Sequence, residues 1–163
     1  MIIVRRFALG DAAPVIELIT QIMSQEFGEA KAAYPTEDIQ NIQTSYGALG
    51  EAFLVATDEN RIVGTIGVKK EDDRVALMRR LFVAAAYRRR NIGRQLIENA
   101  VQFCGEVGYQ EVVFKTTSKM VQAIELCKKC GFVQRAKLQL GPIELLKFSL
   151  PIRDHVKVGR NHR

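Results

Sequence analysis

The sequence predicts an α/β (α+β) domain, in which a mixed, mostly antiparallel central sheet is flanked by helices in three layers. Short apolar runs separated by polar turns predict an antiparallel meander near the middle of the chain. Two stretches with apolar residues at helical spacing follow, and each ends at a glycine. The length of 163 residues, with 47 % hydrophobic and 26 % charged residues, fits a single globular domain.

The N-terminal part of the chain contributes a strand and two helices to this prediction. Residues 2–6, Ile-Ile-Val-Arg-Arg, predict a short strand. Asp11 suits a helix N-cap, and apolar residues at helical spacing follow it. A second helix is expected to begin at Thr36, where Glu37 and Asp38 would lie near its positive end.

The remaining elements continue the alternation of strands and helices. The meander is expected as three strands, over residues 52–57, 62–68 and 75–83. A strong helix is predicted over residues 92–107, and Gly108 follows it as a C-terminal glycine. The last elements are a strand over 111–117, a helix that Ser118 caps and Gly131 ends, and strands over 132–135 and 143–150.

Location and metal content are predicted from what the sequence lacks. No apolar run approaches the roughly 20 residues that span a bilayer. Met1 to Arg6 show no signal peptide, so we expect a cytoplasmic protein without a membrane partner. The three cysteines are an odd number, which fits poorly with a disulfide framework. Cys127 and Cys130 form a Cys-x-x-Cys pair without further ligands at zinc spacing, so we expect no metal.

The net charge of +6 is concentrated in two places. Residues 151–163 supply half of it and are expected to form a basic tail after a domain over residues 1–150. The window from Arg79 to Arg94 holds six arginines and no acid. A solvated basic face is the simplest interpretation, and a nucleic-acid binder is an alternative. Aromatic residues that would stack on bases are sparse, which disfavours nucleic acid as a partner.

The segment from Leu81 to Leu96 predicts an anion site, since a strand ends there, a basic turn follows and a helix begins. The first N–H groups of a helix have no internal partner and suit a pyrophosphate. Gly93 in the first turn lets that backbone approach phosphates, and Asn91 tolerates a left-handed turn conformation. Charge-assisted hydrogen bonds to phosphate would come from Arg88, Arg89, Arg90 and Arg94.

The pattern Arg88-x-x-Asn91-x-Gly93 resembles Arg/Gln-x-x-Gly-x-Gly/Ala, the acetyl-CoA signature of the GNAT family of N-acetyltransferases, with asparagine replacing the first glycine. Residues 123–132 resemble the family's Ala-Ile-x-Phe-Tyr-x-x-x-Gly-Phe segment, and the element order agrees over residues 2–150. The resemblance implies a GNAT-like fold and an acyltransferase that moves an acetyl group from acetyl-CoA directly to a primary amine. The acceptor would be a small molecule or a peptide, and a homodimer is compatible with the resemblance.

The resemblance also implies where acetyl-CoA binds. It would lie between the fourth and fifth strands, and its pantetheine arm would pair with residues 81–83. The backbone N–H of Phe82 or Val83 would polarise the thioester carbonyl. The implied cofactor-binding residues are Leu81, Phe82, Val83, Arg88, Arg89, Arg90, Asn91, Ile92, Gly93, Arg94 and Ser118.

Two catalytic positions depart from the family pattern. Residues 76–80 hold no acid where many members place a glutamate, so the sequence assigns no base. Cys127 stands in place of the usual tyrosine acid, and three roles stay open: an acid, a packing residue, or a nucleophile. These departures motivate an alternative, an acyl-CoA-binding sensor without turnover. Four residues of the loop between the first helices are expected to be solvated, with contact to the acceptor as the alternative: Glu26, Glu29, Lys31 and Tyr34.

Overall fold

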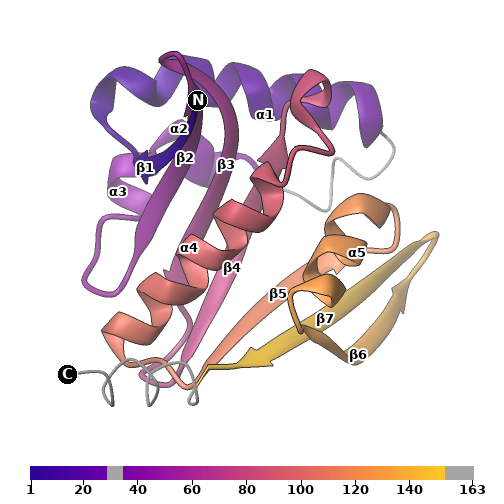
Figure 1. The fold of residues 1–163 in the computed structure, drawn as a ribbon. Helices are drawn as coiled ribbons and strands as arrows, with labels where there is room; N and C mark the ends of the chain where they lie inside the picture. Colours follow the sequence, from indigo (N-terminus) through magenta and orange to yellow (C-terminus); the bar gives the residue numbers. More distant parts are fainter. Residues whose placement is uncertain (29–34, 153–163) are drawn as a thin grey trace.

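Seven strands form one sheet in the order β1-β2-β3-β4-β5-β7-β6 among the residues that the computed structural model describes, 1–28 and 35–152. All neighbouring strands are antiparallel except β4 and β5, which run parallel. The prediction of a mixed, mostly antiparallel sheet is confirmed (Figure 1). The strands are β1 (Ile2–Arg6), β2 (Ala52–Asp58), β3 (Arg61–Lys70), β4 (Val75–Val83), β5 (Glu111–Thr117), β6 (Val133–Leu140) and β7 (Ile143–Pro151).

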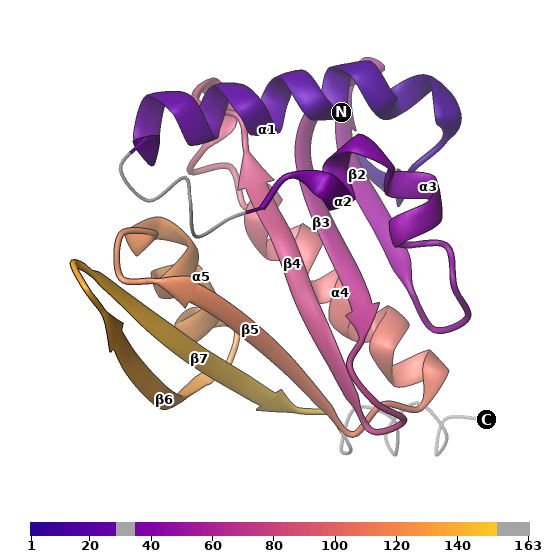
Figure 2. The same ribbon diagram turned by 180° about the vertical axis from the view of Figure 1, so that it is seen from behind.

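Helices cover both faces of the sheet and complete the predicted three layers. One apolar cluster joins the sheet to α4 and α5, and a second joins it to α1, α2 and α3. Figures 1 and 2 show these two groups from opposite sides. The helices are α1 (Ala12–Glu26), α2 (Glu37–Gln40), α3 (Ile42–Ser45), α4 (Ile92–Val107) and α5 (Val121–Lys129), and short 3-10 turns lie at Leu9–Asp11 and Ala85–Tyr87.

Most predicted boundaries are confirmed, and three local expectations are wrong. The helix expected from Thr36 is interrupted at Asn41, whose φ of −140° and ψ of 58° separate α2 from α3. Ser118 does not cap α5, because the helix begins at Val121 after Met120. Strand β6 extends to Leu140, five residues beyond the expected end. Its residues are all exposed, and Ala136, Leu138 and Leu140 alternate with polar residues, a pattern typical of a strand that the prediction did not use.

The packed domain extends at least to Ile152. This side chain is fully buried in the cluster under α4 and α5, and its N–H donates to the carbonyl of Gln110 at 3.1 Å. The rest of the predicted basic tail lies outside the described residues. None of the helices in the described part of the chain is long and apolar enough to cross a membrane.

Candidate functional site

The parallel strands β4 and β5 pair over only four residues each. Val75–Met78 lies beside Glu111–Phe114, although β4 continues to Val83 and β5 to Thr117. Beyond these four pairs the strands diverge, as Figure 2 shows. Their separation interrupts the sheet in its middle, where backbone groups would otherwise bond across the two strands.

A bulge in β4 lies at the point of divergence. Thr65 of β3 pairs with Phe82 and Gly67 pairs with Arg79, so β4 carries one residue more than β3 between these pairs. Arg80 adopts a positive φ of 57°, and the Thr65 hydroxyl donates to its carbonyl at 2.7 Å. The sequence does not predict this bulge, because the positive φ falls on an arginine rather than on a glycine. Two adjacent arginines inside a buried strand were the only signal.

The Arg80 side chain is held by Asp38 of α2. Only 4 % of the Arg80 side chain is exposed, and its Nε and Nη2 donate to the two carboxylate oxygens of Asp38 at 2.9 and 2.5 Å. Tyr46 donates its hydroxyl to the same carboxylate at 2.5 Å, and Arg80 also donates to the carbonyl of Pro35. Burial opposes the charged carboxylate, but the hydrogen bonds from Arg80 and Tyr46 outweigh it and hold the pKa of Asp38 below its ordinary value.

The backbone of Val83 points away from β3. The N–H of the next residue, Ala84, donates to the carbonyl of Val63 in β3 at 2.8 Å. Backbone groups alternate in direction along a strand, so the N–H of Val83 faces the diverging side and that of Phe82 faces β3. The Val83 carbonyl points the same way and accepts from Nε of Arg88 at 3.1 Å. Of the two predicted carbonyl-polarising donors, Val83 is the one directed into the gap.

The basic turn before α4 has the left-handed geometry that the sequence predicts. Asn91 has a φ of 62° and precedes the helix, and Arg89 has a φ of 66°. The first intrahelical bond runs from the N–H of Gln95 to the carbonyl of Asn91 at 3.0 Å. The N–H groups of residues 92–94 therefore precede the helical ladder and point towards the turn.

Gly93 is required by packing as well as by backbone approach. A Cβ atom at this position would lie 2.4 Å from Cδ2 of Leu126 and 3.6 Å from Cγ2 of Val83. The start of α4 therefore packs directly against α5, and no side chain fits between them. The absence of a side chain keeps the backbone of the first turn accessible from the neighbouring cavity.

A cavity of about 690 Å³, the loop cavity, lies between this turn, α5, the end of β4 and the end of α1. The structure brings nine of the eleven predicted cofactor-binding residues together there: Leu81, Phe82, Val83, Arg88, Arg89, Asn91, Ile92, Gly93 and Arg94. The other two lie elsewhere. Arg90 stacks on the ring of Tyr87 at 5.0 Å, and the N–H of Ser118 donates to the carbonyl of Glu144.

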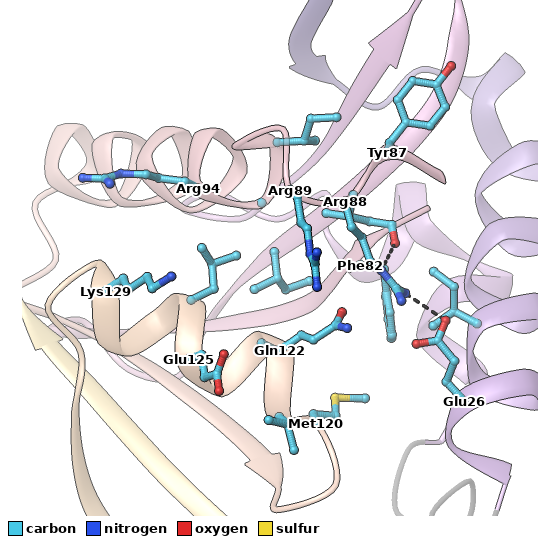
Figure 3. Close-up of a pocket in the computed structure, with 18 of the residues that line it drawn as sticks. Glu26, Phe82, Tyr87, Arg88, Arg89, Arg94, Met120, Gln122, Glu125 and Lys129 are labelled. Carbon is cyan, nitrogen blue, oxygen red and sulfur yellow. Dashed lines mark hydrogen bonds and ion pairs between the residues drawn. The ribbon is translucent and has the colours of Figure 1, made fainter. Parts of the chain in front are cut away.

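The arginines of the loop cavity divide into two kinds. Arg88 is engaged internally, because it contacts the Val83 carbonyl and forms an ion pair of 2.8 Å with Glu26 (Figure 3). Arg89 points into the space between the turn and α5, towards Gln122 (Figure 3). Glu26 is exposed, as expected, but it belongs to α1 rather than to the following loop, and it lines the cavity. The other three residues of that expectation lie outside the described residues.

A second cavity of about 490 Å³, the sheet cavity, lies over β4, β5, β7 and β6. It shares Leu81, Phe82 and Met120 with the loop cavity. The two cavities therefore meet where β4 and β5 diverge.

Cys127 lies outside both cavities. Its side chain is 0 % exposed in the apolar cluster of α4 and α5, and the neighbouring Leu126 lines the loop cavity instead. Burial raises the pKa of the Cys127 thiol to about 12, which makes it a weaker acid and a poorer nucleophile. Of the three roles left open by the sequence, this placement supports packing.

Solved structures of the same fold are acetyltransferases. An acetyltransferase of the GNAT family from Staphylococcus aureus Mu50 superposes with a TM-score of 0.81 at 22 % identity, over 94 % of this chain and 100 % of that one. A putative acetyltransferase from Salmonella typhimurium, solved with its cofactor acetyl-CoA, gives 0.78 at 16 % identity over 94 % and 95 %. At these identities the likeness establishes the fold alone.

The chain belongs to the acetyltransferase (GNAT) family, whose sequence model matches residues 16–132. Human N-acetyltransferase 8 is 33 % identical over 101 residues, which are 58 % of this chain and 44 % of that protein. N-acetylaspartate synthetase from Xenopus tropicalis is 31 % identical over 84 residues, 51 % of this chain and 31 % of that protein. The chain thus spans less than half the length of these two curated relatives.

Proposed function

We propose that the chain is an acetyl-CoA-dependent N-acetyltransferase, which acts as a single domain and transfers an acetyl group to an amine. The observation that carries this proposal is the meeting of the loop cavity and the sheet cavity at Leu81, Phe82 and Met120. A thioester held in the first cavity would face an amine held in the second. The bound acetyl-CoA of the Salmonella neighbour and the names of the curated N-acetyltransferases support the same activity.

Acetyl-CoA binds in the loop cavity. Its pyrophosphate accepts hydrogen bonds from the first N–H groups of α4, at Ile92, Gly93 and Arg94, where the helix dipole favours an anion. Arg89 points into the same space and adds a positive charge. The pantetheine arm then runs along the diverging edge of β4 towards Phe82.

The transfer itself forms one bond and breaks one. The neutral amine attacks the thioester carbonyl, whose developing negative charge is stabilised by the N–H of Val83. An N–C bond forms, the C–S bond breaks, and the CoA thiolate leaves with the electron pair of that bond. No acid lines the described wall of the sheet cavity, so the amine releases its proton to water.

An assay of CoA thiol release across a panel of amines tests this function, with acetyl-CoA affinity measured separately by calorimetry. We expect binding of acetyl-CoA and turnover with at least one amine of the panel. Tight binding without turnover of any amine would instead favour the acyl-CoA-binding sensor. Absence of acetyl-CoA binding would contradict the proposal altogether.

A further inference from the structure

Among the described residues, every charged side chain that lines the sheet cavity is a cation. The five are Arg79, Arg80, Lys115, Lys137 and Lys147. Apolar side chains supply much of the remaining wall, among them Leu77, Phe114, Leu138 and Leu145. This lining repels a cationic acceptor such as a polyamine and attracts an anion, because opposite charges are favoured in a cavity partly shielded from water.

Neighbouring carboxylates neutralise only part of this charge. Arg80 is paired with Asp38, Lys115 lies 3.3 Å from Glu71, and Lys137 lies 3.7 Å from Glu144. These carboxylates belong to residues outside the cavity wall.

Two of these cations are not fully neutralised by a neighbouring carboxylate. Lys147 is half-buried and forms no ion pair with any residue of the described ranges. Arg79 lies 4.0 Å from Asp38, a carboxylate already bonded by Arg80 and Tyr46. The cavity therefore presents Lys147 and Arg79 as groups that an anionic ligand can pair with.

Three of the cations lie in a row across the sheet. Lys115 of β5 pairs directly with Lys147 of β7. Arg79 follows Met78, the partner of Phe114, and so begins the divergence of β4 on the same face as Lys115. Like charges opposite one another on adjacent strands about 4.8 Å apart are destabilising. A bound anion removes this repulsion, so the row marks a place where a ligand stabilises the sheet.

We propose that the acceptor is a free amino acid, whose carboxylate binds Lys147 and Arg79 while its amine points towards Phe82. This inference rests on the proposed function and specifies its acceptor. The carboxylate would lie over β5 and β7, and the side chain would contact the apolar wall formed in part by Leu138 and Leu145.

The same row of cations prepares the amine for attack. Positive charges near an ammonium group favour its deprotonated form and lower its pKa. An amino acid held by its carboxylate against the cations therefore presents its nitrogen as the neutral nucleophile, and the proton leaves to water. The cavity thereby performs part of the task of a general base, a residue that the sequence does not supply at the family position.

Matched pairs of acceptors test the proposal through steady-state kinetics. The pairs are leucine with leucinamide, and phenylalanine with phenylalaninamide, in which a carboxamide replaces the α-carboxylate. We expect kcat/KM to be at least about tenfold higher for the carboxylate member of one or both pairs, the usual range for a charge-assisted contact.

Lys147→Met is expected to reduce this preference about tenfold, mainly through KM. Lys128→Met, an exposed change of equal charge on α5 outside both cavities, leaves the preference unchanged.

A binding measurement separates this proposal from the proposed function. Calorimetry of the same amino acids with the complex of enzyme and CoA requires no turnover. Selective binding of the carboxylate members, lost in Lys147→Met, supports the acceptor class even if no acetylated product forms. Equal affinity and equal kcat/KM for carboxylate and carboxamide members would overturn it, and so would a preference that Lys147→Met leaves intact.

Discussion

The loop cavity and the sheet cavity share three residues, but the chain builds them differently. Ten residues of the loop cavity come from one continuous stretch of chain, 81–94. The sheet cavity collects its wall from β4, β5, β6 and β7, together with Pro35 and Met120. A site made from one stretch leaves a pattern in the sequence, and a site made from many leaves none.

The two cavities also differ in the groups that they offer. The loop cavity contains acids as well as cations, and the pyrophosphate site that we propose there consists largely of the backbone N–H groups at the start of α4. The sheet cavity offers side-chain cations on fixed strands. A backbone site is sensitive to steric changes, whereas a side-chain site is sensitive to changes of charge.

The largest effect is expected at the backbone site. Gly93→Glu places a Cβ where Leu126 lies 2.4 Å away and adds a carboxylate beside the pyrophosphate position. We expect the affinity for acetyl-CoA, measured by calorimetry, to fall at least about 100-fold, because both steric fit and helix-end electrostatics are lost. Gln102→Glu adds the same charge on the exposed side of α4 and serves as the control.

A second variant tests the same site without the steric change that could cause Gly93→Glu to misfold. Arg89→Met removes a cation that points into the loop cavity without disturbing the contact of α4 with α5. We expect its acetyl-CoA affinity to fall about fivefold to tenfold at an unchanged melting temperature. Wild-type affinity in both variants would show that acetyl-CoA binds elsewhere.

The next largest effect concerns the wall of the sheet cavity. Asp38→Asn leaves the buried Arg80 guanidinium without its carboxylate. We expect the free energy of unfolding to fall by about 3 kcal/mol, the usual cost of an unpaired buried charge. Asp73→Asn is the control, since the Asp73 side chain is 92 % exposed in its pair with Lys70, and we expect a change within about 0.5 kcal/mol.

The loss of unfolding free energy in Asp38→Asn depends on pH in a defined direction. The folded pKa of Asp38 lies below its ordinary value, so its contribution to stability is complete above about pH 4. The contribution disappears as the pH falls through the folded pKa. The difference in unfolding free energy between wild type and Asp38→Asn should therefore narrow in acid. A difference that stays constant from pH 7 to pH 3 would show that Asp38 does not carry the charge that holds Arg80.

The contrast between the cavities explains how far the sequence could predict the molecule. Asn91 has a left-handed conformation that few residues tolerate, and Gly93 lies where a Cβ atom would meet Leu126, so the turn before α4 was predictable from residue type. The row formed by Arg79, Lys115 and Lys147 depends on strand register across residues up to 68 positions apart. No local pattern encodes that register. The positive φ of Arg80 was equally hidden, because the long-range contact with Asp38 holds its side chain.

A smaller effect is expected at Cys127, which lines neither cavity. Cys127→Ala removes one buried sulfur atom and should lower the free energy of unfolding by about 1 kcal/mol. We expect kcat and acetyl-CoA affinity to stay within about twofold of wild type from pH 7 to 9, because the thiol is buried and its pKa is raised. A large loss of kcat in Cys127→Ala, partly restored in Cys127→Ser, would instead establish an acid. A covalent acetyl adduct in mass spectrometry would establish a nucleophile.

The smallest effect is expected from removal of residues 153–163, a segment that holds all four cations of the basic stretch at the end of the chain. A chain that ends at Ile152 keeps the buried side chain and its hydrogen bond to Gln110, and it keeps every described residue of both cavities. We expect its melting temperature, acetyl-CoA affinity and preference for carboxylate acceptors to match those of the full chain. A chain that ends at Leu150 loses Ile152 and should be less stable by about 2 kcal/mol or more, because a fully buried isoleucine is removed. If the shorter deletion alone abolished the preference for carboxylates, the cations beyond Ile152 would be responsible for it, and the difference between the two cavities would not rest on Lys147 and Arg79.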